Sequence, residues 1–348
     1  MQNNGIADEI LSLINNEEIQ PSANIVVSTC SAYDYLNNSV PNLEKMTVKY
    51  YETFAITSRF TGYTSNINIG EFYDLMSTKV ASPTSILGGL NSTTRKELSK
   101  ENSSSSEGSE SSGSSSPGDS SGSGSSSNSS GGSSSSSATS TNYEQSNEAS
   151  SDATINPEDL TANSSSITGN RGTENIGIAV FKNDALCGKL TAVETICHLL
   201  IVNDVDSCII SIDSPVTEDT KTEIRLVPSK KSKIKVNLVD DIPHISIDLE
   251  LNADIMTLEN NVNYQSNETI NKISNAAKQY MENQLNDYLN KVCKEYGVDI
   301  DNLYTKALSN FLTIPEWENF NWDEKIKNAN FDINVDVNFV SGVLITET

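Results

Sequence analysis

The chain has 348 residues, a formal net charge of −24 at pH 7 and a hydrophobic share of 36%. Its length allows two domains, and a serine-rich middle accounts for a hydrophobic share below that of ordinary globular chains. The negative charge argues against a nucleic-acid partner, because a phosphate backbone would be repelled.

Cysteine usage and hydropathy exclude further classes of protein. The five cysteines include no CxxC pair, so neither a zinc site nor a disulfide framework is predicted. No window reaches the run of about 18 apolar residues that a membrane span needs. Residues 1–20 lack the basic start and the apolar core of a signal peptide, so the chain as given is expected to be soluble.

Residues 1–95 are predicted to form a small α/β unit, part of a larger N-terminal region. They offer little core and begin directly in a helix, which indicates that the unit is incomplete. Gly88-Gly89 is interpreted as a turn. The expected elements are a helix over residues 6–14, a strand over 24–28, a helical turn over 32–36, a strand over 66–69 and a helix over 70–76.

Residues 96–172 are predicted to be a disordered linker or a tolerated insertion. Serine runs broken by glycine fill this segment, and no Lys or Arg occurs between Lys100 and Arg171. Such a segment cannot bury enough apolar surface to offset its ordering entropy, so a flexible coil is expected. A modified or binding segment is the alternative interpretation.

Residues 173–348 are predicted to form an α+β domain. Thr191 is a natural N-cap for a helix, and Glu194 follows at the spacing of a capping box. Alternation over residues 232–239 and 244–251 predicts a hairpin with one solvated face, turned by residues 240–243. The other expected elements are strands over 178–181, 186–190, 208–212, 222–227 and 331–339, and helices through 196–201 and over 301–311.

The longest predicted element is an amphipathic helix over residues 268–296, about 43 Å long. Ser266 and Asn267 are good N-cap residues, and Gly297 stands where a left-handed C-cap residue is expected. Such a long apolar stripe must be covered by the flanking strands. The fold class predicted for the ordered parts is therefore α+β, with helices packed on one face of antiparallel or mixed sheets.

The sequence predicts no enzyme, no cofactor and no metal site. The two histidines, His198 and His244, have no Ser, Cys or carboxylate beside them in a pattern typical of a triad or a metal site. No glycine-rich phosphate motif and no EF-hand pattern occurs. Two interpretations of Trp317 and Trp322 stay open, namely an aromatic patch for a partner and packing onto the long helix.

The stretch from Ala179 to Gly188 (AVFKNDALCG), with Leu190-Thr191 and Glu194-Thr195, resembles the opening of the C-terminal domain of the Ger(x)C family. The family comprises the C subunits of GerA-type spore nutrient-germinant receptors. Later features are similar in order, including the hairpin, the long helix followed by residues 296–300, the tryptophan segment and the last strand. Residues 17–23 (EEIQPSA) also resemble part of the family's N-terminal region.

This resemblance implies a non-enzymatic receptor subunit at the outer face of the spore inner membrane, with A and B subunits as partners. It also implies an N-terminal lipid anchor. The chain shows neither the lipoprotein signal peptide nor the lipid-modified cysteine of the family, and an incomplete sequence is expected. A freestanding extracellular lipoprotein that binds a small ligand is the alternative function. Interaction surfaces are sought at Gly188, Leu190 and Glu194, and at Trp317 and Trp322.

Overall fold

The computed structural model describes residues 5–39, 47–78, 80–96, 157–164, 172–258, 262–264 and 266–339. The chain divides into two units, Met1–Lys96 with Ile155–Thr348, and Glu97–Thr154. All described residues belong to the first unit. The prediction of a flexible serine-rich linker falls almost entirely outside the described residues.

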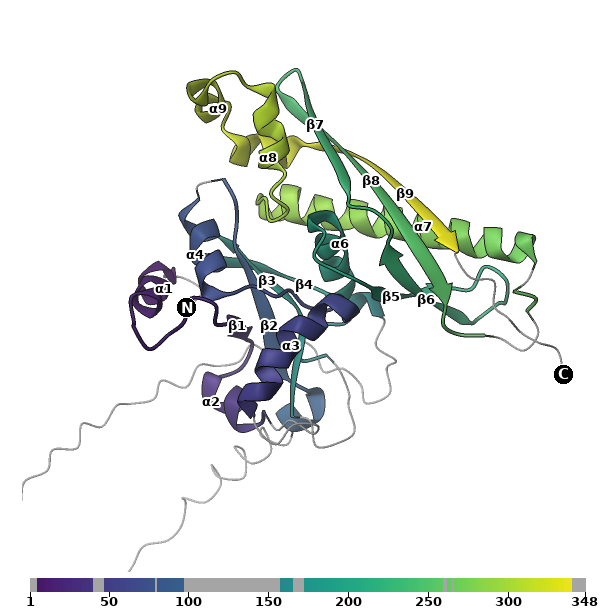
Figure 1. The fold of residues 1–348 in the computed structure, drawn as a ribbon, viewed down its shortest axis with the longest axis horizontal. Coiled ribbons are helices and arrows are strands. Elements are labelled where there is room, and N and C mark those ends of the chain that lie inside the picture. Colours follow the sequence, from purple (N-terminus) through teal and green to yellow (C-terminus); the bar gives the residue numbers. More distant parts are fainter. Residues whose placement is uncertain are drawn as a thin grey trace, which may run out of the picture. The chain divides into compact units, whose positions relative to one another are not determined.

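The first sheet joins residues from both sides of the serine-rich segment (Figure 1). Its order is β1-β2-β3-β4, where β1 runs parallel to β2 and the other neighbours are antiparallel. Residues 173–190, assigned from sequence to the C-terminal domain, thus complete a sheet begun by the N-terminal region. Whether 1–95 and 173–348 behave as separate domains stays a prediction. The strands are β1 (Val26–Ser28), β2 (Thr84–Leu90), β3 (Thr173–Lys182) and β4 (Ala185–Leu190).

Gly88 and Gly89 lie within strand β2, so their assignment to a turn is wrong. Both glycines are needed for close approach rather than for a bend. A Cβ at Gly88 would press on Val26 and Tyr35, and a Cβ at Gly89 would overlap Asn163. The sequence pattern alone could not show that neighbours from three other segments pack on this strand.

The N-terminal region contains the helices α1 (Ala7–Ile14), α2 (Ala32–Asn37), α3 (Thr47–Thr61) and α4 (Ile69–Ser77). Helix α3 was not predicted, because its polar and apolar residues do not separate into faces. The strand expected over residues 66–69 is reduced to a single bridge between Asn24 and Asn68. Asn68 instead caps α4, in a capping box with Glu71.

Strand β3 is buried on both faces and separates two apolar clusters. Ile178 and Val180 belong to the larger cluster, which includes helix α6 (Ala192–Val202). Ala179 and Phe181 belong to the smaller cluster, with side chains from α1 and α4. A continuous apolar strand is what a sheet covered on both sides requires. The first sheet therefore differs from the one-faced packing expected for the domain.

The second sheet has the order β5-β6-β8-β7. In addition, every residue of β9 pairs with β8, and the two strands are parallel. Strands β7 and β8 form the predicted hairpin. Asp240 and Asp241 between them both have positive φ values, 52° and 60°, the backbone of a tight two-residue hairpin turn. The strands are β5 (Cys208–Asp213), β6 (Lys221–Pro228), β7 (Lys233–Val239), β8 (Ile242–Ile255) and β9 (Asn330–Phe339).

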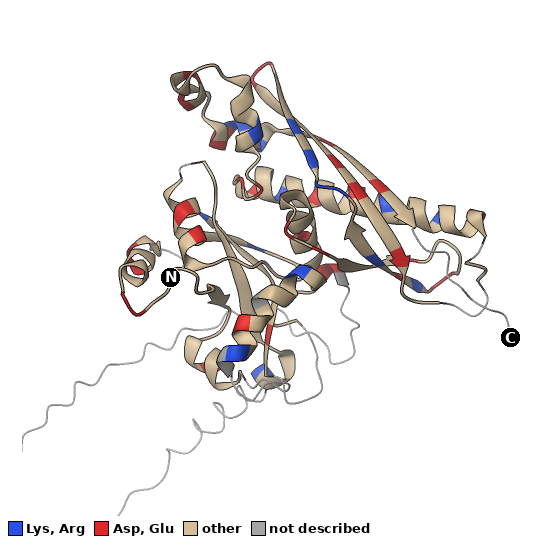
Figure 2. Cartoon of the chain, in the orientation of Figure 1, with Lys and Arg blue, Asp and Glu red and all other residues tan. Residues whose placement is uncertain are grey.

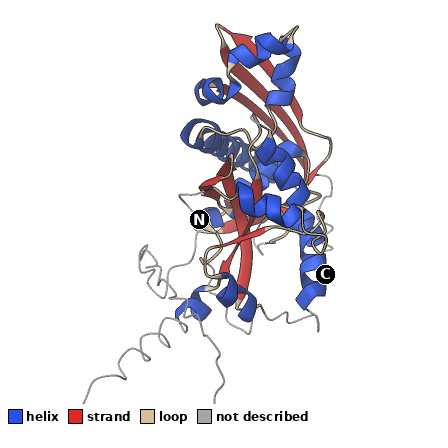
Figure 3. Cartoon of the chain, turned by 90° about the vertical axis from the view of Figure 1, so that its left-hand side faces the viewer, coloured by secondary structure: helices blue, strands red, loops and turns tan. Residues whose placement is uncertain are grey.

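The long helix is α7 (Asn267–Leu289), continued by a π-helical segment, η2 (Asn290–Tyr296), and ended by Gly297 at φ 64°. Its buried residues repeat at three- and four-residue steps, as the apolar stripe predicted. Ser266 stands at the N-cap, but its side chain accepts no capping hydrogen bond. Helix α7 packs along β9 on one face of the second sheet (Figures 1 and 3).

Short helical elements connect α7 to β9. They are α8 (Tyr304–Ala307), η3 (Leu308–Asn310), α9 (Ile314–Phe320), α10 (Trp322–Lys325) and η4 (Ile326–Asn328). The single helix expected over residues 301–311 is thus a brief α-helix that tightens into a 3₁₀ turn. The mixed sheets and packed helices confirm the α+β class.

Candidate functional site

The loop of residues 297–303, which follows α7, is the best candidate site because buried polar groups from four segments meet there. Asp299 and Asp301 on this loop are both buried. A buried carboxylate costs free energy unless hydrogen bonds or charges compensate it. Each of the two aspartates has its own set of partners.

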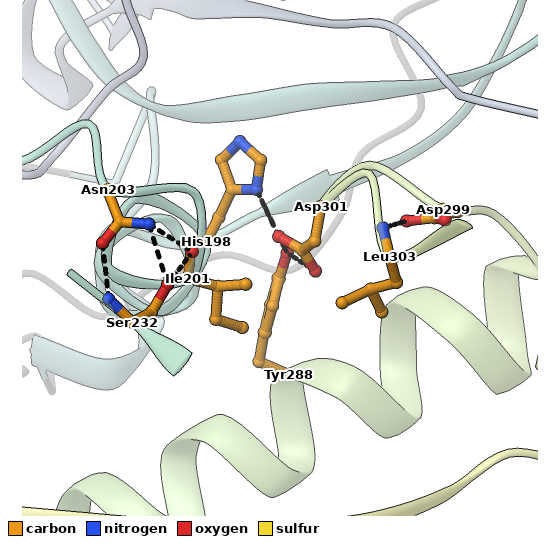
Figure 4. A network of polar contacts seen from close by, with 8 residues as sticks. All are labelled: His198, Ile201, Asn203, Ser232, Tyr288, Asp299, Asp301 and Leu303. Carbon is orange, nitrogen blue, oxygen red and sulfur yellow. Dashed lines mark hydrogen bonds and ion pairs between the residues drawn. The ribbon is translucent and has the colours of Figure 1, made fainter. Parts of the chain in front are cut away.

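Asp301 joins helices α6 and α7 to the loop (Figure 4). Its Oδ1 atom lies 2.7 Å from Nδ1 of His198 on α6. The hydroxyl of Tyr288 on α7 donates to both carboxylate oxygens, at 2.8 and 2.9 Å. Burial raises the pKa of Tyr288 well above its ordinary value, so the hydroxyl keeps its proton and stays a donor.

Asp299 joins the loop to the short helices. Oδ1 accepts from the backbone N–H of Leu303 at 2.9 Å, and Oδ2 accepts from that of Tyr304 at 2.8 Å. Nε1 of Trp322 donates to Oδ2 at 3.0 Å. Burial is the largest influence and raises the pKa of Asp299 from 3.8 to about 7, although the three donors oppose that shift.

The first sheet reaches the same loop through backbone and side-chain contacts. The N–H of Ser82, just before β2, donates to the carbonyl of Asp299 at 3.1 Å. Nζ of Lys182, at the end of β3, donates to the carbonyl of Gly297 at 3.2 Å. The loop therefore ties the first sheet to α6, α7 and the short helices. We call this set of contacts the polar junction.

Gly188, Leu190 and Glu194 lie beside the polar junction. A Cβ at Gly188 would overlap the ring of Tyr296, so glycine is required for this close approach. Leu190 is fully buried, and it cannot serve as an exposed contact. Glu194 completes the predicted capping box with Thr191 and also accepts from Nζ of Lys291 at 2.7 and 2.8 Å.

The two tryptophans, on and just before α10, differ in exposure. Trp322 is buried in the larger cluster and holds Asp299, so it is not a surface residue. Trp317 is half-buried and packs against Phe311, Phe320 and Trp322, with ring centroids 5.3, 6.3 and 5.9 Å away. The structure thus brings Gly188, Leu190 and Glu194 and the two tryptophans to the polar junction. In each of these two groups only some of the residues reach the surface.

The His198–Asp301 pair was missed from the sequence because 103 residues separate its members. The local sequence signal was two acids spaced two residues apart between apolar neighbours, shortly after Gly297, where the helix ends. The pair has no thiolate beside it, because burial raises the pKa values of Cys197 and Cys293 well above the ordinary thiol value. Within the described residues no group of His, Cys, Asp and Glu could hold a metal ion.

The fold and the junction define a two-sheet α+β protein whose sheets are tied together by one buried polar loop. Residues 176–341 match the sequence family described as "Spore germination B3/ GerAC like, C-terminal". Over these residues, just under half of the chain, the sequence is similar to that family, which confirms the resemblance drawn from the stretch that begins at Ala179. The comparison with curated protein sequences gave no match.

A solved structure described as "Crystal Structure of the GerBC protein" has a similar fold. The TM-score is 0.59 at 13% sequence identity, and the match covers 98% of this chain and 76% of that chain. At this identity the likeness concerns the fold alone. Among the helices of the described residues, none is long and apolar enough to cross a membrane.

Proposed function

We propose that this chain is the non-enzymatic C subunit of a spore nutrient-germinant receptor. The observation that carries the proposal is the family match over residues 176–341, which spans the second sheet, β4 and most of β3 in the first sheet, and the polar junction apart from Ser82. In this role the chain acts through protein–protein contacts with the A and B subunits. An N-terminal lipid holds it at the outer face of the spore inner membrane.

The polar junction supports a structural rather than a catalytic role for its ionisable groups. His198, Asp299 and Asp301 are all buried, and their partners are groups of the same chain. A general acid or base must reach a substrate proton directly or through one water molecule. Groups held in this way stabilise the placement of α6, α7 and the first sheet, whose outer surfaces then serve for contacts.

Germination of spores that lack this chain tests the proposal. We expect these spores to lose the response to one class of nutrients, and a copy of the gene to restore it. In membranes from wild-type spores, the A and B subunits should be retained with an affinity-tagged chain. Normal germination with all nutrients, together with no retained subunit, would contradict the proposal.

A thermal-shift series with amino acids and sugars separates this function from small-ligand binding. For a subunit that acts through contacts with other proteins, the isolated chain should unfold at the same temperature with and without each nutrient. Reproducible stabilisation by one nutrient would instead favour the ligand-binding alternative, since a ligand that binds only the folded state raises its stability.

A further inference from the structure

Large aliphatic side chains are exposed together at the end of the second sheet that carries the β7–β8 turn. Leu312 is 94% exposed and Ile314 is 73% exposed, both between η3 and the first turn of α9. Single exposed apolar residues are ordinary, whereas a group of them marks an interaction site. We call the group the aliphatic tip, and its exposed members are Val239, Ile242, Leu308, Leu312 and Ile314.

The helical and strand parts of the aliphatic tip are held next to each other. Nδ2 of Asn310 donates to the carbonyl of Val236 on β7 at 2.9 Å, and α8 packs against β7. Nζ of Lys325 on α10 lies 3.8 Å from Oδ2 of Asp241 in the turn. Figure 1 shows α8 and α9 beside the β7–β8 turn, and the view in Figure 3 agrees.

Leu312 and Ile314 project from a backbone that is fixed on both sides. The N–H of Leu312 donates to Oε2 of Glu316 at 3.1 Å, and Thr313 caps α9 by accepting from the N–H of Glu316. The preceding residue, Phe311, packs against Trp317 with ring centroids 5.3 Å apart. A contact surface ordered in advance loses less conformational entropy on binding than a loose loop.

Acidic positions occur on the β7–β8 turn and on the short helices beside it (Figure 2). In the β7–β8 turn and residues 304–325, Asp and Glu outnumber Lys and Arg. The acids are Asp240, Asp241, Glu316, Glu318, Asp323 and Glu324, and the bases are Lys306 and Lys325. One of the two bases, Lys325, is paired with Asp241. The rim therefore attracts cationic groups, and it repels an anionic lipid surface.

We propose that the aliphatic tip docks a protein segment that presents aliphatic side chains between lysine or arginine residues. The apolar centre supplies the buried contact area, and the acidic rim selects the flanking charges. This inference deepens the proposed function, because the partner segment then belongs to another subunit of the receptor. It also replaces Trp322, which is buried, with residues that can reach a partner.

Co-purification of the full chain with the A and B subunits from spore membranes tests the inference. The variants Leu312→Asp and Ile314→Asp place a charge in the apolar centre, and we expect them to retain at least tenfold less of the partner subunits. Leu36→Asp is the matched control, since Leu36 on α2 is also an exposed leucine, at 63%. It should retain as much as the wild type, and all three variants should unfold at the wild-type temperature.

Charge reversal tests the rim separately from the centre. The double variant Glu318→Lys and Glu324→Lys removes acids at exposed positions of α9 and α10. Retention of the partner should fall and should depend less on salt concentration than in the wild type. Retention equal to the wild type at low salt would overturn the role of the rim.

Three further results would overturn the inference. The first is full retention of the subunits by Leu312→Asp and by Ile314→Asp, a result that leaves the proposed function standing. If the wild-type chain itself does not retain the subunits, the inference and the proposed function are both rejected. The second is binding of the wild type, but not Leu312→Asp, to vesicles of phosphatidylglycerol and phosphatidylethanolamine. The third is a dimer of the chain in sedimentation that Leu312→Asp dissociates.

Discussion

Asp299 shows how two opposed effects act on one buried side chain. Three donors point at its carboxylate, and hydrogen bonds to the charged form favour ionisation. Burial disfavours ionisation more strongly, and the nearby charge of Asp301 adds to that effect, so the pKa rises to about 7. The folded chain thus binds a proton at Asp299 that the unfolded chain releases near pH 4.

The raised pKa predicts a pH dependence of stability with a definite sign. Between about pH 4 and about pH 7 the folded state holds more protons at this position than the unfolded state, so the free energy of unfolding falls as the pH rises. In Asp299→Asn this part of the slope should vanish, because an amide does not titrate. The variant should also be less stable at pH 5 by about 1–3 kcal/mol, since one acceptor oxygen replaces two.

Urea unfolding from pH 4.5 to pH 8 measures both effects. Asp332→Asn is the matched control, because Asp332 is an exposed carboxylate on β9, and its slope over this range should follow the wild type. An Asp299→Asn variant with the wild-type slope would show that Asp299 is ionised in the folded chain throughout.

The capping box on α6 could be predicted from the sequence, whereas the partner of Asp301 could not. The Thr191–Glu194 capping box was readable because its partners lie three residues apart. The pairing of His198 with Asp301 was not, since only the fold brings α6 against the loop after α7.

At the scale of elements, helix α7 also closes the free edge of the second sheet. Strand β9 pairs with β8 on one side, and its other side exposes backbone groups that could pair with another chain. Oε1 of Glu282 accepts from the N–H of Val335 at 3.1 Å, and the hydroxyl of Ser274 donates to the carbonyl of Val337 at 2.6 Å. The helix therefore supplies hydrogen-bond partners as well as apolar cover.

This arrangement predicts that Glu282→Ala loosens β9 locally. The buried N–H of Val335 loses its acceptor, at a cost of about 1–2 kcal/mol. Amide hydrogen exchange should then be roughly tenfold faster at Val335, while the paired strands β5 and β6 keep their protection.

Glu268→Ala serves as the comparison for that experiment. Glu268 is an exposed residue of the same helix and pairs with Lys272 at the next turn, 2.8 Å away. Its loss should leave the stability of the chain and the exchange at Val335 close to those of the wild type, because an exposed ion pair contributes little. Equal exchange at Val335 in the wild type and in Glu282→Ala would contradict the role assigned to Glu282.

At the scale of the whole molecule, residues before and after the serine-rich segment depend on each other. Strand β2 pairs with β3 along most of its length, and Leu90 at its end lies opposite Thr173. Asn163 adds a second connection, because its Oδ1 accepts from the N–H of Leu90 at 3.1 Å. The chain therefore leaves and re-enters the first sheet at the same end of the neighbouring strands β2 and β3.

Because the ends return together, most of the segment should be dispensable for folding. Replacement of residues 97–154 by about 20 glycine and serine residues should raise the free energy of unfolding by about 1 kcal/mol or less, since loop-closure entropy depends only weakly on length. Urea unfolding of the two chains measures the difference.

The complementary experiment removes the N-terminal region. A fragment of residues 173–348 lacks β2, so β3 has a free edge and one uncovered apolar face. It should aggregate or unfold at a clearly lower temperature than the shortened chain. Equal stability of the fragment and the shortened chain would instead support two independent domains, as the sequence predicted.

Periodic patterns determined the parts of this protein that depend on neighbours along the chain. The alternation in β7 and β8, the stripe of α7 and the end of the helix at Gly297 follow from side-chain period and backbone freedom, so the α+β class could be predicted. The order of motifs after Ala179 also carried the family resemblance.

Tertiary structure alone decided which distant residues meet. Gly88 and Gly89 lie in a strand because β2 pairs with β1 and β3, and Asp301 gains its partners only when α6 and α7 pack together. The exposure of Leu312 beside the buried Trp322 likewise depends on how short helices fold onto the second sheet. Local sequence encodes period and turns, whereas burial and long-range pairing arise only from the assembled chain.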